Sequence, residues 1–280
     1  MFNSPQIKEL IAKNNLCINK RFGQNFLIDQ GKRDKMISLC NLKGGDRVLE
    51  IGPGLGALTE SILSKCASLI AVEKDRGLAD ILKSLYADNK KLEIVSRDIL
   101  KYAIPALPDR VKVIGNLPYY ITSPIIFYLL ENRDRLDSIF ITVQKDVAQR
   151  ILSGPGNKDY GLLSLGVQYY CQPLKLCTLP KGCFFPVPKV DSMFISLEIR
   201  KVPLVSVTDE RLFFMVMKAG FNQRRKTFFN ALAKGVIASI DKGLLEEAFV
   251  ISGLDKNIRA EDLSLDKFAR FSNALSSLHE

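Results

Sequence analysis

The chain has no tryptophan, and its single histidine, His279, is the penultimate of 280 residues. Residues at a terminus are commonly frayed, so a mechanism that needs a histidine base is disfavoured. The six cysteines stand in apolar surroundings without a C-x-x-C pair, which predicts reduced, buried thiols and no metal site. No apolar run is long enough to span a bilayer, and the first residues do not resemble a signal peptide. We therefore expect a soluble cytoplasmic protein without membrane contact.

The chain also lacks an excess of acidic residues, and its formal net charge is +10. The first 47 residues alone hold nine Lys or Arg against four Asp or Glu. A basic front of this kind suits a phosphate backbone, and charge favours a nucleic-acid partner. An ordinary solvated basic surface is the alternative.

A glycine-rich turn follows the first predicted strand, residues 46–51. Gly52 and Gly54 belong to a G-x-G-x-G pattern, after which residues 57–66 have helical spacing. Strand, turn and helix in this order let the backbone approach a ligand closely. The next strand ends at Glu73, which can accept hydrogen bonds from ribose hydroxyls. The pattern predicts a nucleoside-type ligand, although the G-x-G-x-x-G dinucleotide fingerprint is not met.

Two further strand ends carry candidate site residues. After residues 92–95, Asp98 can accept from the amine of a bound adenine, with Ile99 against the face of the ring. An aspartate that caps a turn is the alternative for Asp98.

After residues 111–114 the chain continues Gly-Asn-Leu-Pro-Tyr-Tyr. The amide oxygen of Asn116, with the carbonyl of Leu117 or Pro118, can accept both N–H bonds of an adenine or cytosine amine and localise its lone pair. Tyr119 can stack on that base. The alternative is an ordinary polar turn.

Strands and helices alternate, which predicts a Rossmann-like α/β domain with a mostly parallel sheet over residues 1–202. Residues 203–280 have helical character and predict a small all-α C-terminal domain. Basic clusters occur in both parts and are assigned to phosphate contact: Lys20 and Arg21 near the front, and Arg224, Arg225 and Lys226 in the tail. Prolines stiffen the segment that contains Phe184. We expect its ring either to form a second wall beside a bound base or to lie in the core.

These motifs together, at residues 20–27, 50–56, 73, 98, 116–119, 184–190 and 223–227, resemble the rRNA adenine N6-dimethyltransferases over almost the whole chain. Within that family the chain is most similar to the small-subunit, or KsgA, branch. The resemblance implies a class I fold and S-adenosylmethionine as methyl donor. It also implies dimethylation at N6 of two adjacent adenosines in the 3′-terminal hairpin loop of 16S rRNA, within a pre-small-subunit ribosomal particle. A monomer is expected.

The resemblance also implies roles for individual residues. The expected cofactor contacts are Asn25, Leu27, Gly52, Gly54, Glu73, Asp98, Ile99 and Asn116. The expected catalytic residues are Asn116, Pro118, Tyr119 and Phe184. Three alternatives stay open: a large-subunit rRNA methyltransferase of the macrolide-resistance type, a non-catalytic ribosome assembly factor, and a nicotinamide-dependent oxidoreductase, which the glycine spacing disfavours.

Overall fold

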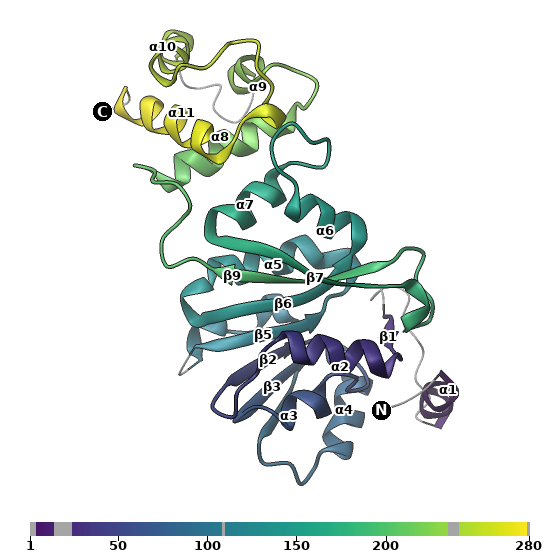
Figure 1. The fold of residues 1–280 in the computed structure, drawn as a ribbon. Helices are drawn as coiled ribbons and strands as arrows, with labels where there is room; N and C mark the ends of the chain where they lie inside the picture. Colours follow the sequence, from purple (N-terminus) through teal and green to yellow (C-terminus); the bar gives the residue numbers. More distant parts are fainter. Residues whose placement is uncertain (1–3, 14–23, 108–109, 235–240, 279–280) are drawn as a thin grey trace. The chain divides into compact units, whose positions relative to one another are not determined.

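A seven-stranded sheet forms the main body of the protein in a computed structural model that describes residues 4–13, 24–107, 110–234 and 241–278 (Figure 1). The strand order is β4-β3-β2-β5-β6-β9-β7. The first five strands in this order are parallel, and β9 is antiparallel to β6. The strands are β2 (Arg47–Ile51), β3 (Ser68–Glu73), β4 (Leu92–Ser96), β5 (Val111–Asn116), β6 (Leu136–Gln144), β7 (Cys171–Leu179) and β9 (Ser192–Ile199). The expected Rossmann-like α/β fold is confirmed.

The central strands are apolar because both faces of the sheet are covered. In β5, for example, Val113 and Ile114 are adjacent in sequence, point to opposite faces and are both 0% exposed. The helices that follow or precede these strands are α1 (Ser4–Lys13), α2 (Gln30–Leu39), α3 (Thr59–Leu63), α4 (Arg76–Leu85), α5 (Thr122–Glu131) and α6 (Lys145–Leu152). Short 3-10 turns are η2 (Ile99–Lys101), η3 (Ile104–Ala106), η4 (Tyr119–Ile121), η5 (Arg133–Arg135), η6 (Lys181–Cys183) and η7 (Ala260–Asp262).

A second, two-stranded sheet joins segments that lie far apart in the chain. Strand β1 (Phe26–Leu27) pairs antiparallel with β8 (Phe184–Phe185), so that Leu27 lies opposite Phe184. The N–H of Ile28 also donates to the carbonyl of Cys183 at 2.8 Å. These bonds hold the segment before α2 beside the carboxyl ends of the parallel strands.

The chain divides into two compact units, residues 1–148 with 172–199 and residues 149–171 with 200–280. This division differs from the expected 1–202 and 203–280, because residues 149–171 group with the C-terminal helices. Tyr160 and Tyr169 belong to the core of the second unit, and the Tyr160 hydroxyl donates to the Leu263 carbonyl at 3.1 Å. The second boundary lies at Arg200, close to the expected position.

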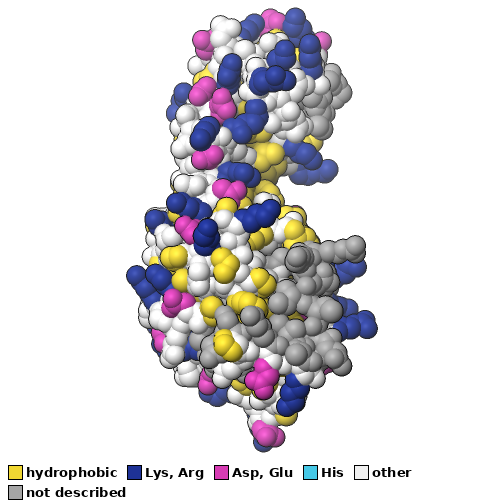
Figure 2. All heavy atoms as spheres, turned by 90° about the vertical axis from the view of Figure 1, so that its right-hand side faces the viewer, with side chains coloured by type: hydrophobic (Ala, Val, Ile, Leu, Met, Phe, Trp, Pro, Cys, Tyr) yellow, Lys and Arg dark blue, Asp and Glu magenta, His cyan; other side chains and the backbone are white. Residues whose placement is uncertain are grey.

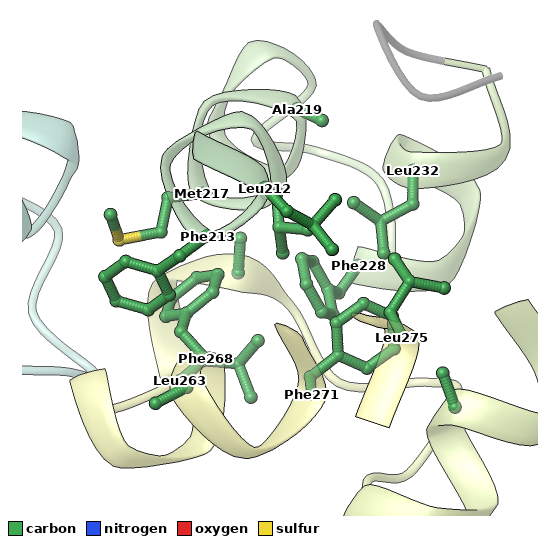
Figure 3. Packing of buried hydrophobic residues seen from close by; sticks show 14 of the residues in the cluster. Leu212, Phe213, Met217, Ala219, Phe228, Leu232, Leu263, Phe268, Phe271 and Leu275 are labelled. Carbon is green, nitrogen blue, oxygen red and sulfur yellow. The ribbon is translucent and has the colours of Figure 1, made fainter. Parts of the chain in front are cut away.

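The described residues of the second unit form helices and turns apart from Cys171, the first residue of β7, as the sequence predicts for its C-terminal part. Its helices are α7 (Leu162–Tyr170), α8 (Glu210–Asn222), α9 (Phe228–Ala233), α10 (Lys242–Ser252) and α11 (Leu265–Ser277). Figure 3 shows that Phe213, Phe228, Phe268 and Phe271 from α8, α9 and α11 point into one core, and all four are 0% exposed. Among the helices that the structure describes, none has the length and apolar character needed to cross a membrane.

Candidate active site

A pocket lies at the carboxyl ends of β2, β3, β4 and β5, where open parallel sheets place their ligands. The eight residues expected to hold the cofactor all line it, and so do Pro118 and Tyr119. The segments that form its wall are residues 24–27, 50–54, 72–74, 97–99 and 116–121, together with Ala57, Leu58 and Leu78. Parallel strands end at one edge of the sheet, which is why motifs spread over almost 100 residues converge here.

The glycine turn and Glu73 form one hydrogen-bonded unit. Gly52 and Gly54 have φ values of 67° and 61°, a backbone conformation that favours glycine. The N–H of Gly54 donates to one oxygen of Glu73 at 3.0 Å, and the N–H of Asp75 donates to the other at 2.9 Å. Glu73 is only 7% exposed, and burial raises its carboxyl pKa although these N–H groups act in the opposite direction. The carboxylate is therefore held in one orientation at the wall of the pocket.

Glu50 is a second buried acid in the pocket wall, and the sequence analysis did not single it out. It is 1% exposed, and the hydroxyl of Thr59 donates to its Oε2 at 2.7 Å. Burial raises the pKa of Glu50 to about 8. A carboxylate in the middle of the apolar run of residues 48–51 is the sequence signal that could have identified it.

Asn116 lines the pocket, and its side chain has a buried acceptor without a hydrogen-bond partner among the described residues. Its side-chain Nδ2 donates to the backbone carbonyl of Asn25 at 3.0 Å, which fixes the orientation of the amide. Its Oδ1 is buried and has no hydrogen-bond partner among the described residues. A buried acceptor without a partner costs about 1–3 kcal/mol, so this oxygen suits a ligand that brings an N–H group. The residues present thus fit a ligand with an amine at this point.

The sequence left two carbonyls, those of Leu117 and Pro118, as candidate acceptors for the amine. The hydrogen bonds of the segment after Asn116 distinguish between them. The Pro118 carbonyl already accepts from the N–H of Ile121 and from the hydroxyl of Thr122, both at 3.2 Å. This arrangement disfavours Pro118 as the acceptor for a substrate amine and favours the carbonyl of Leu117. The Tyr119 hydroxyl lies 2.8 Å from the hydroxyl of Ser192, which orients the half-buried ring. Burial raises the pKa of Tyr119, so the side chain is a neutral phenol.

Asp98 lines the pocket and also caps a turn, so the two interpretations of its sequence position do not exclude each other. It lines the pocket, and its Oδ1 also caps η2 by accepting from the N–H of Leu100 at 3.1 Å. Its Oδ2 lies 2.9 Å from Nζ of Lys74, a pocket residue that the sequence did not indicate. Ile99 is buried beside it, 5% exposed.

Phe184 does not line the pocket. It is 1% exposed and packs in a core cluster with residues such as Leu27 and Phe194. Its pairing with Leu27 across the two-stranded sheet is the reason, because the side chains of opposed residues share one face. The structure therefore supports the core interpretation of this phenylalanine, and not the expected aromatic wall.

The basic residues assigned to RNA separate into two groups. Lys20 and Arg21 lie outside the described residues. Arg224, Arg225 and Lys226 are all exposed after α8, and Arg224 also makes contacts within the second unit. An Nη of Arg224 lies 2.6 Å from the Lys158 carbonyl and 3.2 Å from Oε2 of Glu261. Figure 2 shows Lys and Arg side chains at many points of the face that it presents, interspersed with fewer acidic ones.

No set of three or more His, Cys, Asp or Glu side chains suited to a metal ion occurs within residues 4–13, 24–107, 110–234 and 241–278. The cysteines described in these ranges, Cys40, Cys66, Cys171, Cys177 and Cys183, are free and buried. This agrees with the expected reduced thiols.

Comparison with known proteins identifies relatives along the whole chain. A family model described as "Ribosomal RNA adenine dimethylase" matches residues 15–277. Curated proteins named "Ribosomal RNA small subunit methyltransferase A" are similar throughout. The protein from Alkaliphilus oremlandii is 42% identical, with 96% of each chain covered, and the one from Clostridioides difficile is 40% identical, with 96% and 95% covered.

Solved structures agree on the fold. A dimethyladenosine transferase from Plasmodium falciparum is similar with a TM-score of 0.73 at 24% identity, covering 88% of this chain and 95% of the other. The 23S rRNA methyltransferase ErmE has a TM-score of 0.67 at 22% identity, covering 90% and 100%. Together with the family match and the relatives near 40% identity, the pocket at the strand ends leads to one conclusion: the chain belongs to the ribosomal RNA adenine dimethylase family and is a methyltransferase that uses S-adenosylmethionine.

Proposed function

We propose that this protein transfers methyl groups from S-adenosylmethionine to N6 of two adjacent adenosines in the 3′-terminal hairpin loop of 16S rRNA. The proposed substrate is a pre-small-subunit ribosomal particle, and the proposed site of action is the cytoplasm, with the protein as a monomer. The observation that carries the proposal is the unpaired, buried Oδ1 of Asn116 at the pocket wall. Relatives that span 96% of the chain and are named for the small subunit support the choice of substrate.

The pocket residues divide into a cofactor side and a substrate side. On the cofactor side, Glu73 accepts from ribose hydroxyls and Asp98 accepts from the amine of the cofactor's adenine; both residues line the pocket, which supports these roles. Gly52 and Gly54 have the positive φ values that the tight turn at this side of the pocket requires. When bound, S-adenosylmethionine supplies an electrophilic methyl group on a positively charged sulfur.

On the substrate side, the target adenine must leave its stack, which costs a few kcal/mol and least for an unpaired loop. The Tyr119 ring stacks on that base, and its hydrogen bond to Ser192 supports this role by orienting the ring. Asn116 Oδ1 and the Leu117 carbonyl accept the two N–H bonds of the amine and localise its lone pair for attack. The same oxygens stabilise the positive charge that develops on the nitrogen. The methylated ammonium loses its proton readily, so no histidine or other general base is required.

Methyl transfer to ribosomal particles tests this function directly. Labelled S-adenosylmethionine would be supplied with unmodified small-subunit particles and, separately, with large-subunit rRNA, and the nucleosides would be identified after digestion. Dimethyladenosine is expected only from the small-subunit particles. Label found only in large-subunit RNA would indicate a methyltransferase of the macrolide-resistance type. Tight particle binding without label would indicate a non-catalytic assembly factor.

Glu73→Gln is expected to weaken binding of S-adenosylhomocysteine by about 10- to 100-fold, because a charged acceptor for ribose hydroxyls is lost. Isothermal titration calorimetry measures this directly. Glu93 is an exposed acid on the neighbouring strand β4 and lies outside the pocket, so Glu93→Gln serves as the control. Equal affinities for the two variants would contradict the assigned role of Glu73.

Arg225 and Arg224 are expected to respond differently to replacement by alanine. The exposed Arg225 is the better candidate for phosphate contact, so Arg225→Ala should weaken rRNA binding and reduce the slope of log K against log salt by about 1. Arg224→Ala should mainly lower the stability of the second unit, because the guanidinium joins Lys158 and Glu261. Filter binding at several salt concentrations and thermal unfolding distinguish the two effects. An unchanged salt slope for Arg225→Ala would exclude phosphate contact at that position.

A further inference from the structure

Lys74 joins three separate elements at the edge of the pocket. It follows Glu73 at the end of β3, and its Nζ lies 2.9 Å from Oδ2 of Asp98, beyond the end of β4. The same Nζ lies 3.4 Å from the hydroxyl of Tyr120 in η4 and 5.8 Å from the centroid of the Tyr120 ring. All three side chains line the pocket.

Both oxygens of Asp98 are anchored by this arrangement. Oδ1 accepts from the N–H of Leu100 and Oδ2 from Lys74, so the plane of the carboxylate is fixed. Each carboxylate oxygen has a second lone pair and can still accept from a ligand. Burial by itself raises the pKa of Asp98, but the hydrogen bonds from Lys74 and Leu100 and the charges of Lys74 and Lys101 lower it overall. Asp98 is therefore an ionised group at neutral pH that accepts hydrogen bonds and donates none.

An anionic acceptor of this kind discriminates between purines. It accepts from the amine at position 6 of adenine, and it repels the carbonyl oxygen that a 6-oxo purine has there. If Asp98 lost its ion pair, only the N–H of Leu100 would still hold its carboxylate, and Oδ2 would no longer be anchored by a cation. The acceptor would then be less well fixed in position, and the 6-oxo purine would be repelled less strongly.

We propose that Lys74 is a positioning residue that holds Asp98 as a fixed, anionic acceptor and thereby sets the preference of the cofactor site for adenine over a 6-oxo purine. The inference deepens the proposed function and depends on it, since it requires that Asp98 faces the purine of the cofactor.

The test compares the affinities of two ligands, S-adenosylhomocysteine and S-inosylhomocysteine, by isothermal titration calorimetry. Lys74→Met keeps the length of the aliphatic chain and removes the ammonium. It is expected to weaken binding of the adenosyl ligand by about 10-fold and to reduce the ratio of the two affinities by at least that factor. Lys74→Arg should restore most of the preference. In steady-state assays, Lys74→Met should raise KM for the cofactor and leave kcat within about threefold of the parent.

Two control variants isolate the ion pair. Lys101→Met removes an exposed lysine whose charge also acts on Asp98, and it should leave the ratio of affinities unchanged. Tyr120→Phe removes the hydroxyl near Lys74 and keeps the ring, and it should also leave the ratio unchanged. If Tyr120→Phe reproduced the effect of Lys74→Met, the hydroxyl and not Asp98 would carry the preference, and the proposal would be overturned.

The failure of this inference differs from the failure of the proposed function. If the parent protein prefers the adenosyl ligand and the Lys74→Met variant keeps the same preference, only the role of Lys74 is overturned. An equal loss of affinity for both ligands in that variant also overturns it, because a general disturbance of the pocket would explain the loss. Parent protein that binds neither ligand would overturn both proposals.

Discussion

Asn116→Ala is expected to lower kcat for methyl transfer by about 100- to 1,000-fold, the range found when one preorganised hydrogen-bonding group at a reacting centre is removed. The variant loses the buried Oδ1 that accepts from the substrate amine. The nitrogen lone pair then stays delocalised into the purine ring, and the charge that develops on nitrogen has one acceptor fewer. Single-turnover assays with saturating cofactor and unmodified small-subunit particles measure the effect on the chemical step.

Cofactor binding distinguishes this effect from a collapse of the pocket. Because Glu73 and Asp98 are unchanged in the variant, its affinity for S-adenosylhomocysteine should stay within about tenfold of that of the parent. The matched control is Asn89→Ala, since Asn89 lies in the turn before β4 and outside the pocket. Turnover of Asn116→Ala within threefold of the parent would exclude the proposed role of the amide.

The second large effect concerns the stability of the helical unit. Phe228→Ala should lower the free energy of unfolding of this unit by about 3–5 kcal/mol, as is typical for a buried phenylalanine. The Phe228 side chain is 0% exposed, and its ring centroid lies 5.1 Å from that of Phe271 and 5.4 Å from that of Phe268. Figure 3 shows these rings meeting between α8, α9 and α11. Urea unfolding followed by circular dichroism gives the change.

The adjacent Phe229 provides the control. It is only partly buried and contacts Lys256 and Phe249 at the edge of the same core, so Phe229→Ala should cost clearly less, about 1–2 kcal/mol. Comparable losses for both variants would show that the buried position of Phe228 is not what stabilises the unit.

Much of the pocket wall was predictable because its residues follow strand ends in chain order. Gly52, Glu73, Asp98 and Asn116 each stand at or just after the end of a parallel strand, and all of them line one pocket. The alternation of strands and helices predicts the parallel sheet, and a parallel sheet collects the ends of its strands at one edge. The sequence alone thus determined the fold class, the location of the pocket and the family.

The features that the sequence did not predict depend on contacts between residues far apart in the chain. Pairing of β1 with β8 buries Phe184 opposite Leu27, more than 150 residues earlier, and the sequence did not distinguish this from an aromatic wall. Arg224 bonds to Lys158 and Glu261, and the sequence did not predict these contacts. The same kind of long-range packing assigns residues 149–171 to the helical unit.

The electrostatic state of the pocket is the other property that only the tertiary structure decided. Lys74 meets Asp98 because β3 and β4 are neighbours in the sheet, and Glu50 has a raised pKa because the folded protein buries it. Burial and charge pairing arise when segments pack together, and a local pattern of residue types does not record them. The sequence predicted most of the chemical groups that line the pocket, and the packing of the strands determined which of them are charged, anchored or left with a free acceptor.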